Sequence, residues 1–232
     1  MSSSDARRER HWLPGIVLRV LVAFAVLALI THTLVRPFVI PSASMEPTLM
    51  TGDRVLAQVV GVDEAQLQRG DVVVFSHGRT WGEERIDDPN PVSDAARHVG
   101  DLLGTGPSHH AHTVKRVIGL PGQTVECCDE QGRVLVDGEP IDEPWVRHDL
   151  PMPADGDCST ESTARCFDPI TVPEGSYLVL GDNRANSSDS VAGCRGQVEG
   201  DCATARFVRA DQVVGTLGWR WWPLPPGGAE RR

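Results

Sequence analysis

The chain has 232 residues, enough for one soluble domain of roughly 200 residues after a short N-terminal element. Its formal net charge of -10 excludes nucleic acid as a partner, because phosphate backbones are bound through a surplus of Lys and Arg. With 23 Gly, 17 Pro and little helical periodicity beyond the N-terminus, the sequence predicts a mostly β fold with short strands and long loops.

An apolar run over residues 12–35 follows a polar, arginine-bearing stretch over residues 1–11. As a helix, the segment Ile16 to Val35 would span about 30 Å, the thickness of a hydrocarbon core. The arginines predict a cytoplasmic tail, and therefore an extracytoplasmic domain over residues 36–232. Two alternatives are a cleaved signal peptide and a buried core helix, since the uninterrupted apolar stretch is only Val20 to Ile30.

Small residues surround Ser44 in PSASMEPTL, residues 41–49, and their composition resembles a signal-peptide cleavage site. Ser44 lies 14 residues after Ile30, which argues against cleavage there. Pro47 indicates a short helix starting near Ser44, for which the serine would be the N-cap. A serine beside exposed backbone N–H groups also suits an oxyanion hole, so both interpretations stand.

The next segments predict a strand and an inserted loop. RGDVVVF, residues 69–75, indicates a Gly-Asp turn that leads into a buried strand. Residues 76–111 are rich in polar residues, Pro and Gly, and we expect a flexible insertion. Its HHAH motif, with His109, His110 and His112, offers metal ligands, but a solvated loop is favoured. We assign no metal and no cofactor.

Lys115 is the only lysine among 22 lysine and arginine residues. It lies in VKRVIGLPG, residues 114–122, whose alternation predicts a strand. An arginine keeps its proton at physiological pH, whereas a desolvated lysine can lose it and act as a general base. The simpler alternative is a solvated strand lysine, and only the fold could pair it with Ser44, 71 residues earlier.

Six cysteines, all in the C-terminal half, favour disulfides in an oxidising compartment. The alternative is reduced, buried cysteines, while zinc is disfavoured because no C-x2-C spacing is present. Six cysteines allow 15 connectivities, so the sequence leaves the pairing open. The pairs that bracket polar loops are favoured, namely Cys158 with Cys166 and Cys194 with Cys202.

Residues 126–171 are expected to form a variable β subdomain with a hairpin at Asp137 and Gly138. GDNRANSSDS, residues 181–190, has the composition of a loop, and its oxygen spacing does not fit an EF-hand calcium site. The tryptophans of GWRWWPLPPGG, residues 218–228, suit either a membrane surface or a final strand with one ring exposed.

Taken in order, the anchor, PSASMEPTL, RGDVVVF, VKRVIGLPG and GDNRANSSDS resemble the bacterial type I signal peptidases, the leader peptidases of the general secretory pathway. The resemblance covers the chain to about Ser190. It implies a single N-terminal transmembrane helix followed by a β-rich catalytic domain with coiled antiparallel sheets. It also implies that Ser44 is the nucleophile and Lys115 the general base of a Ser-Lys dyad.

Further roles are implied by the same match. The Ser42 hydroxyl and the Ser44 backbone N–H would form the oxyanion hole, and Ser187 would orient the Lys115 ammonium. Asp182 and Asp189 would support the site. The substrate-binding residues would be Phe38, Ile40, Pro41, Met45, Leu49, Thr113 and Val114. Two departures are Ala43, where the family often has Gly, and Val191, where it usually has Arg, which puts the local salt bridging in doubt.

The expected activity is removal of signal peptides from exported preproteins at the bacterial cell membrane, with cleavage after small residues. Expected partners are preprotein signal peptides, membrane lipid and the secretory translocation machinery. One alternative is an anchored extracytoplasmic β domain that binds a partner without catalysis. Another is a self-cleaving Ser-Lys repressor of related fold, which needs a DNA-binding domain that the segment before Ser44 does not offer.

Overall fold

The computed structural model describes residues 12–59, 67–82, 89–103, 106, 108–153, 156, 158, 163–196 and 202–223. Its α-helices are α2 (Trp12–Thr33) and α3 (Pro91–Leu103). Its strands are β1 (Val35–Val39), β2 (Arg54–Gln58), β3 (Val72–Ser76), β4 (His112–Gly119), β5 (Thr124–Cys127), β6 (Val134–Val136), β7 (Glu139–Pro140), β8 (Phe167–Thr171), β9 (Ser176–Leu180), β10 (Val208–Arg209) and β11 (Val213–Trp222). The fold is therefore mostly β, as the sequence predicts.

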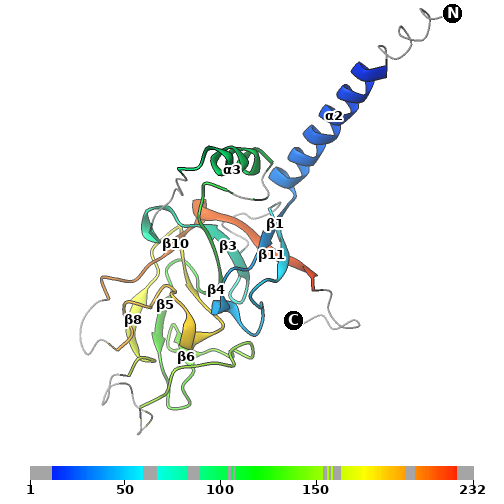
Figure 1. Ribbon diagram of the computed structural model, residues 1–232. Helices are drawn as coiled ribbons and strands as arrows, with labels where there is room; N and C mark the ends of the chain where they lie inside the picture. The colour runs from blue at the N-terminus through cyan, green and yellow to red at the C-terminus, as the bar shows by residue number, and fades with distance from the viewer. Residues whose placement is uncertain are drawn as a thin grey trace, which may run out of the picture.

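Helix α2 occupies the segment for which the sequence predicts the anchor, and it stands away from the β-rich body (Figure 1). Large apolar side chains such as Leu18, Val20 and Leu29 are exposed along it. Within the described residues, no helix is long and apolar enough to cross a membrane. Membrane anchoring by α2 therefore stays a prediction.

The larger sheet has seven antiparallel strands in the order β1-β2-β11-β3-β4-β9-β10. Strand β3 follows the Gly70–Asp71 turn and is buried, which confirms the prediction from RGDVVVF. Strand β4 pairs with β3 along residues 112–116 but with β9 only from Arg116 onward. In the described chain, residues 112–115 thus have one edge without a partner strand, and β1 is an edge strand too.

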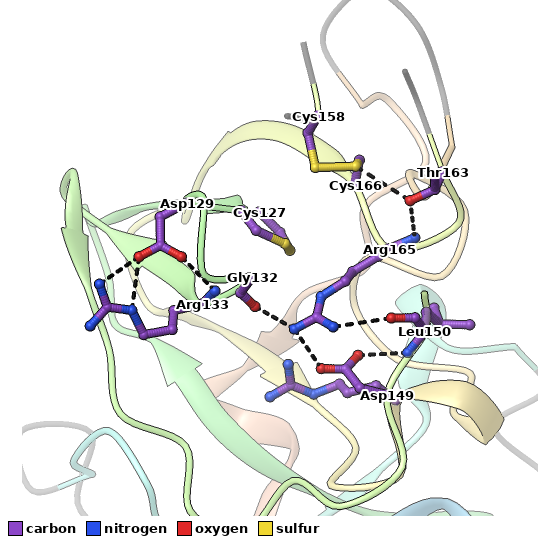
Figure 2. Close-up of a disulfide and its surroundings, with 12 residues drawn as sticks. Cys127, Asp129, Gly132, Arg133, Asp149, Leu150, Cys158, Thr163, Arg165 and Cys166 are labelled. Carbon is purple, nitrogen blue, oxygen red and sulfur yellow. Dashed lines mark hydrogen bonds and ion pairs between the residues drawn. A yellow bond between two sulfur atoms is a disulfide. The ribbon is translucent and has the colours of Figure 1, made fainter. Parts of the chain in front are cut away.

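The smaller sheet has the order β7-β6-β5-β8 and is formed by strands that lie between Thr124 and Thr171. The predicted hairpin is confirmed, because β6 and β7 pair around Asp137 and Gly138, whose φ angles are 54° and 80°. Beside this sheet, Arg165 reaches toward Gly132, Asp149 and Leu150 (Figure 2). Its guanidinium forms an ion pair of 2.9 Å with Asp149 and donates to the Leu150 carbonyl at 3.0 Å.

All six cysteines are paired. Cys158 bonds to Cys166, as Figure 2 shows, and Cys194 bonds to Cys202, so the structure contains both pairings favoured from the sequence. The neighbours Cys127 and Cys128 form a third bond that the sequence analysis did not predict. Each of the two longer links closes a chain segment with a sequence separation of 8.

The prediction of a flexible loop for the insertion is wrong for residues 91–103, which form helix α3. The start of this helix explains why. Pro91 stands at its first position, where a missing N–H costs nothing, and the Val92 N–H donates to the Asn90 side chain at 3.0 Å. Asn90 and Pro91 thus favour a helix locally, although the composition of the insertion as a whole is polar.

The C-terminal strand β11 lies between β2 and β3. It carries Trp219 and Trp222, whose side chains are 59% and 55% exposed. The segment is therefore a strand, but two rings are exposed where the final-strand interpretation expects one, and the membrane-surface interpretation stays a prediction.

Candidate active site

Ser44 lies within a single 3-10 turn, η1 (Ala43–Met45), and its side chain is buried. The N-cap of this turn is Ser42, which makes no side-chain capping bond, so the predicted N-cap role of Ser44 is wrong. The turn is held from outside, because the Asn183 backbone N–H donates to the Ser44 carbonyl at 3.1 Å. The Asn183 side-chain amide also donates to the Ala43 carbonyl at 3.1 Å.

Lys115 comes from β4 and is only 3% exposed, so it is not a solvated strand lysine. Its Nζ donates to Ser44 Oγ at 2.6 Å and to the Val114 carbonyl at 3.2 Å. The two residues singled out 71 positions apart in the sequence are therefore in direct contact. Such a contact between a nucleophile and a base is the geometry that proton transfer requires.

Burial lowers the pKa of Lys115 from 10.5 to about 8. Desolvation is the main cause, because a charged ammonium is disfavoured away from water. The negative charges of Asp189 and Asp182 oppose this shift, while Arg206 adds to it. Near pH 7 a minority of Lys115 is therefore neutral, which is still far more than for an ordinary lysine, and the neutral form is the one that can act as a general base.

Asp182 is almost completely buried and accepts two hydrogen bonds from Arg116, at 2.8 Å from Nε and 2.6 Å from Nη2. It also accepts a hydrogen bond from the Thr48 hydroxyl. Arg116 follows Lys115 on β4, and Thr48 follows Ser44 by four residues. The carboxylate therefore ties the two segments that carry the serine and the lysine together.

Gly181 leaves room for Ser187 and for the chain at Ser44. A Cβ at Gly181 would lie 2.2 Å from Ser187 Oγ and 2.5 Å from the Ser44 carbonyl oxygen. The Ser187 hydroxyl is buried next to this glycine and has no hydrogen-bond partner among the described residues. The expected hydrogen bond from Ser187 to Lys115 is thus not formed in this structure, although Ser187 lies beside Ser44.

Asp189 is fully buried beneath the site. Its carboxylate accepts from the backbone N–H groups of Gly181 and Val191, both at 3.3 Å, and pairs with Arg195 at 3.6 Å. The arginine that the family usually has at position 191 is absent, but Arg195 provides a cation from the next turn of the chain. The local salt bridging that Val191 put in doubt is thus present as an ion pair between Arg195 and Asp189.

Of the expected substrate-binding residues, Ile40, Met45 and Leu49 belong to a buried core cluster with Val55 and Val72. Each is at most 2% exposed, so these side chains are part of the core and do not form an open substrate surface in this structure.

The other expected contacts keep exposed surface: Phe38, Pro41, Thr113 and Val114. The rings of Phe38 and His112 lie 5.4 Å apart, which brings the edge strand β1 close to the unpaired edge of β4. Ser42 lies next to Ser44, with its Oγ 3.3 Å from Ser44 Oγ.

Three positioning residues were not identified from the sequence: Arg116, Asn183 and Arg195. Arg116 and Asn183 lie inside the motifs VKRVIGLPG and GDNRANSSDS, so their place in the motifs was the available signal. Arg195 lies beyond them, and only the fold shows that it reaches Asp189.

Comparison with known proteins gives consistent matches. Residues 13–222 match the family model described as signal peptidase, peptidase S26. A probable signal peptidase I of Mycobacterium leprae is 36% identical over 187 residues, which cover 74% of this chain and 63% of that protein. Signal peptidase IB of Staphylococcus aureus is 31% identical over 215 residues, which cover 90% of this chain and 88% of that protein.

The chain thus spans less than two thirds of the length of its mycobacterial relatives. Among solved structures, a signal peptidase I from Enterococcus faecalis V583 is 26% identical, with a TM-score of 0.33. That match covers 66% of this chain and 97% of the other.

Proposed function

The chain belongs to the signal peptidase family, peptidase S26, and from this membership we propose that it is a serine endopeptidase that removes signal peptides from exported preproteins. One observation carries the proposal beyond the family match. Lys115 Nζ lies 2.6 Å from Ser44 Oγ in a buried setting that lowers the lysine pKa to about 8. A binding module would have no need for a buried, partly neutral lysine beside a serine.

The reaction would begin when neutral Lys115 accepts the proton of Ser44 Oγ, which then attacks the scissile carbonyl carbon. The resulting ammonium would donate a proton to the nitrogen of the scissile peptide bond. The mature part of the preprotein would then leave with this nitrogen as its new amino terminus, while the signal peptide stays bound to Ser44 as an ester. Lys115 would then take a proton from a water molecule, which attacks the ester of the acyl-enzyme. As the ester bond breaks and the signal peptide leaves with a new carboxyl group, the ammonium would return this proton to Ser44 Oγ. Lys115 would thus act as base and then as acid in each of the two half-reactions.

The oxyanion of each tetrahedral intermediate would be bound by the Ser44 backbone N–H and the Ser42 hydroxyl. Ser42 Oγ is 3.3 Å from the nucleophilic oxygen and its residue is exposed, so the hydroxyl can rotate toward a bound carbonyl. Losing one such donor typically costs about 3 kcal/mol of transition-state stabilisation. Ser42 should therefore matter for rate, though less than Ser44 and Lys115.

The substrate would bind in extended form between two strand edges. Strand β1 and residues 112–115 of β4 each have an edge with no partner strand in the described chain, and Phe38 and His112 bring the two edges close together. Main-chain hydrogen bonds to both edges would hold the preprotein without regard to sequence. Small residues before the cut would be selected because the surrounding apolar side chains leave little room.

Membrane topology is part of the proposal. Helix α2 would anchor the chain, residues 1–11 would stay in the cytoplasm, and the domain from residue 36 onward would face outward. The paired cysteines support an oxidising compartment for that domain. The translocation machinery and lipid would then be its neighbours, and the exported chain its substrate.

The decisive experiment is cleavage of a preprotein in detergent by the wild-type chain and by Ser44→Ala. We expect Ser44→Ala to lose cleavage completely while its circular dichroism spectrum stays unchanged. Ser188→Ala is the matched control, because its side chain is exposed and close in sequence to the site, and it should cleave at the wild-type rate. Cleavage by Ser44→Ala would refute the dyad, and a wild-type chain that binds preprotein without cutting it would favour the binding-module alternative.

A further inference from the structure

A cluster of histidine and aspartate side chains lies in the insertion between β3 and β4. Asp94, His98 and Asp101 are spaced four and three residues apart on α3, so they share one face of the helix. His109 joins them from the segment that follows α3 and precedes β4. None of these side chains takes part in the Ser44–Lys115 contacts described above.

Three of these residues place their ligand atoms around a common point. His109 Nε2 is 2.9 Å from Asp94 Oδ1, and His98 Nε2 is 3.3 Å from Asp94 Oδ2. All three ligand atoms lie within 4.8 Å of one another. A tetrahedral zinc ion with ligands at about 2.0–2.1 Å has neighbouring ligand atoms about 3.3 Å apart. Small side-chain rotations would therefore be enough to close these groups around an ion.

The second nitrogen of His109 is held as metal-binding histidines usually are. His109 Nδ1 lies 2.6 Å from Asp101 Oδ2. Asp101 is fixed in turn, since its other oxygen accepts from Ser108 Oγ at 2.7 Å and from the His109 backbone N–H at 3.3 Å. A carboxylate on Nδ1 sets the tautomer and orients the ring, so that Nε2, which contacts Asp94 Oδ1 in this structure, is directed toward the proposed metal position.

Burial and charge fit a dication with one open position. The His109 side chain is 1% exposed, whereas that of His98 is 64% exposed, so the cluster is closed on one side and open to water on the other. Two neutral imidazoles with the carboxylates of Asp94 and Asp101 would balance two positive charges. Imidazole and carboxylate together suit zinc among divalent first-row metals, whereas magnesium and calcium prefer oxygen ligands alone.

We propose that Asp94, His98 and His109 form a zinc-binding site with water as the fourth ligand and Asp101 as the outer-sphere partner of His109. The ion would fasten the segment at His109 to α3, only a few residues before β4 begins. Zinc would thereby link the insertion to the strand that carries Lys115. The sequence-based preference for a solvated loop at HHAH is wrong for His109, which is buried.

The test uses the full chain in detergent, stripped of metal with a chelator and then titrated with zinc chloride against a chromophoric competitor. We expect one zinc ion per chain for the wild type. His98→Ala and Asp94→Asn should bind at least about tenfold more weakly, and Asp101→Asn about 10–100-fold more weakly. His110→Ala is the matched control, because this exposed neighbour lies outside the cluster, and it should bind like the wild type.

X-ray absorption of the zinc-loaded protein should show nitrogen and oxygen ligands at about 2.0–2.1 Å, including two imidazoles. Replacing the exposed His98 does not threaten folding, so that variant remains informative even where changes at buried His109 prevent folding. Absence of zinc binding by the wild type, or equal affinity in His98→Ala and the wild type, would overturn the proposal. Since the measurement is of metal binding, it is independent of whether the chain cleaves preproteins.

Discussion

At the scale of single residues, the central question is the charge of Lys115. A buried ammonium without a close carboxylate is costly, and this residue donates its hydrogen bonds to a hydroxyl and a carbonyl instead. The nearby carboxylates of Asp182 and Asp189 are engaged by Arg116 and Arg195. Because both carboxylates are paired with arginines, they stabilise the Lys115 ammonium only partly. Desolvation therefore remains the larger effect, and Lys115 can lose its proton.

The pH dependence of cleavage should follow this titration. We expect kcat/KM for a signal-peptide substrate to rise with pH and to level off above a midpoint near 8, because only neutral Lys115 can accept the serine proton. An ordinary lysine would place that midpoint near 10.4. A rate that stays constant from pH 6 to 9 would contradict a lysine base.

The same titration predicts a stability change for Lys115→Met. The unfolded chain holds the lysine proton up to about pH 10.5 and the folded chain only to about pH 8, so below pH 8 folding must bury a charge. At about 1.4 kcal/mol per pKa unit, this costs about 3 kcal/mol, and the cost fades as pH rises from 8 toward 10.5. Lys115→Met should therefore be inactive but more stable than the wild type by about 1–3 kcal/mol at pH 6.5.

Denaturant unfolding at pH 6.5 and at pH 9.5 measures the difference in stability between Lys115→Met and the wild type. This difference should be smaller at pH 9.5. A variant less stable than the wild type at pH 6.5 would show that the hydrogen bonds of Lys115 outweigh its desolvation.

At the scale of elements, the turn η1 depends on the loop that follows β9. Gly181, Asn183 and the backbone of Ser44 are packed so closely that the two segments behave as one unit. A 3-10 turn of three residues has little stability of its own. The position of Ser44 is therefore determined by residues more than 130 positions later in the chain.

Gly181→Ala should disrupt this unit. The new Cβ would lie 2.5 Å from the Ser44 carbonyl oxygen, which is backbone and cannot rotate away. We expect a loss of about 1–3 kcal/mol in stability and of about 100-fold in kcat, because a shift of about 1 Å at the nucleophile is enough for that. Gly218→Ala, which meets its nearest neighbour at 3.4 Å, is the control and should change neither value appreciably. Normal kcat for Gly181→Ala would mean that the loop does not position Ser44.

The Cys194–Cys202 link should stabilise the segment around Asp189 and Arg195. It closes a short loop, for which chain-entropy arguments give about 2–3 kcal/mol. The double variant Cys194→Ser/Cys202→Ser should lose about that much stability in urea unfolding under oxidising conditions. Removing Cys158 and Cys166 is the comparison, because that link closes an equal sequence separation and should cost a similar amount of stability.

Sequence reasoning succeeded where a segment is determined by its own residues. The strand after Gly70 and the hairpin at Asp137 follow from local turn chemistry and β-branched runs, and the structure contains both. The sequence predicts α3 poorly, because the polar composition of residues 76–111 is typical of a loop and the helix is indicated only by the local capping residues Asn90 and Pro91. The contacts of Arg195 and the burial of His109 had no local signal, since each depends on segments brought together only by the fold.

At the scale of the whole molecule, an apolar helix adjoins a β body in which Lys115 lies on a strand edge that has no partner among the described residues, and β1 is an edge strand as well. Strand β1 begins two residues after α2 ends, so no flexible linker separates them. If α2 is held in a bilayer, the edge of β1 and the neighbouring serine must stay close to its surface. A membrane-embedded signal peptide would present its cleavage site at that level.

Topology can be tested on intact spheroplasts. A chain tagged at its N-terminus should be digested by added protease everywhere beyond α2, while the tag and the helix remain as a protected fragment. Detergent should remove that protection. A chain that stays whole until the cells are lysed would place the domain on the cytoplasmic side and contradict the proposed orientation.

The distance along the chain between the parts of the site has a consequence for biosynthesis. Ribosomes make proteins from the N-terminus, so Ser44 emerges long before Lys115, and the residues that clamp its turn, Gly181 and Asn183, follow later still. A nascent chain would therefore carry its nucleophile without a base or a fixed geometry until most of the domain had been translated. We expect such a protease to be latent during its own synthesis, and to need no propeptide to keep it so.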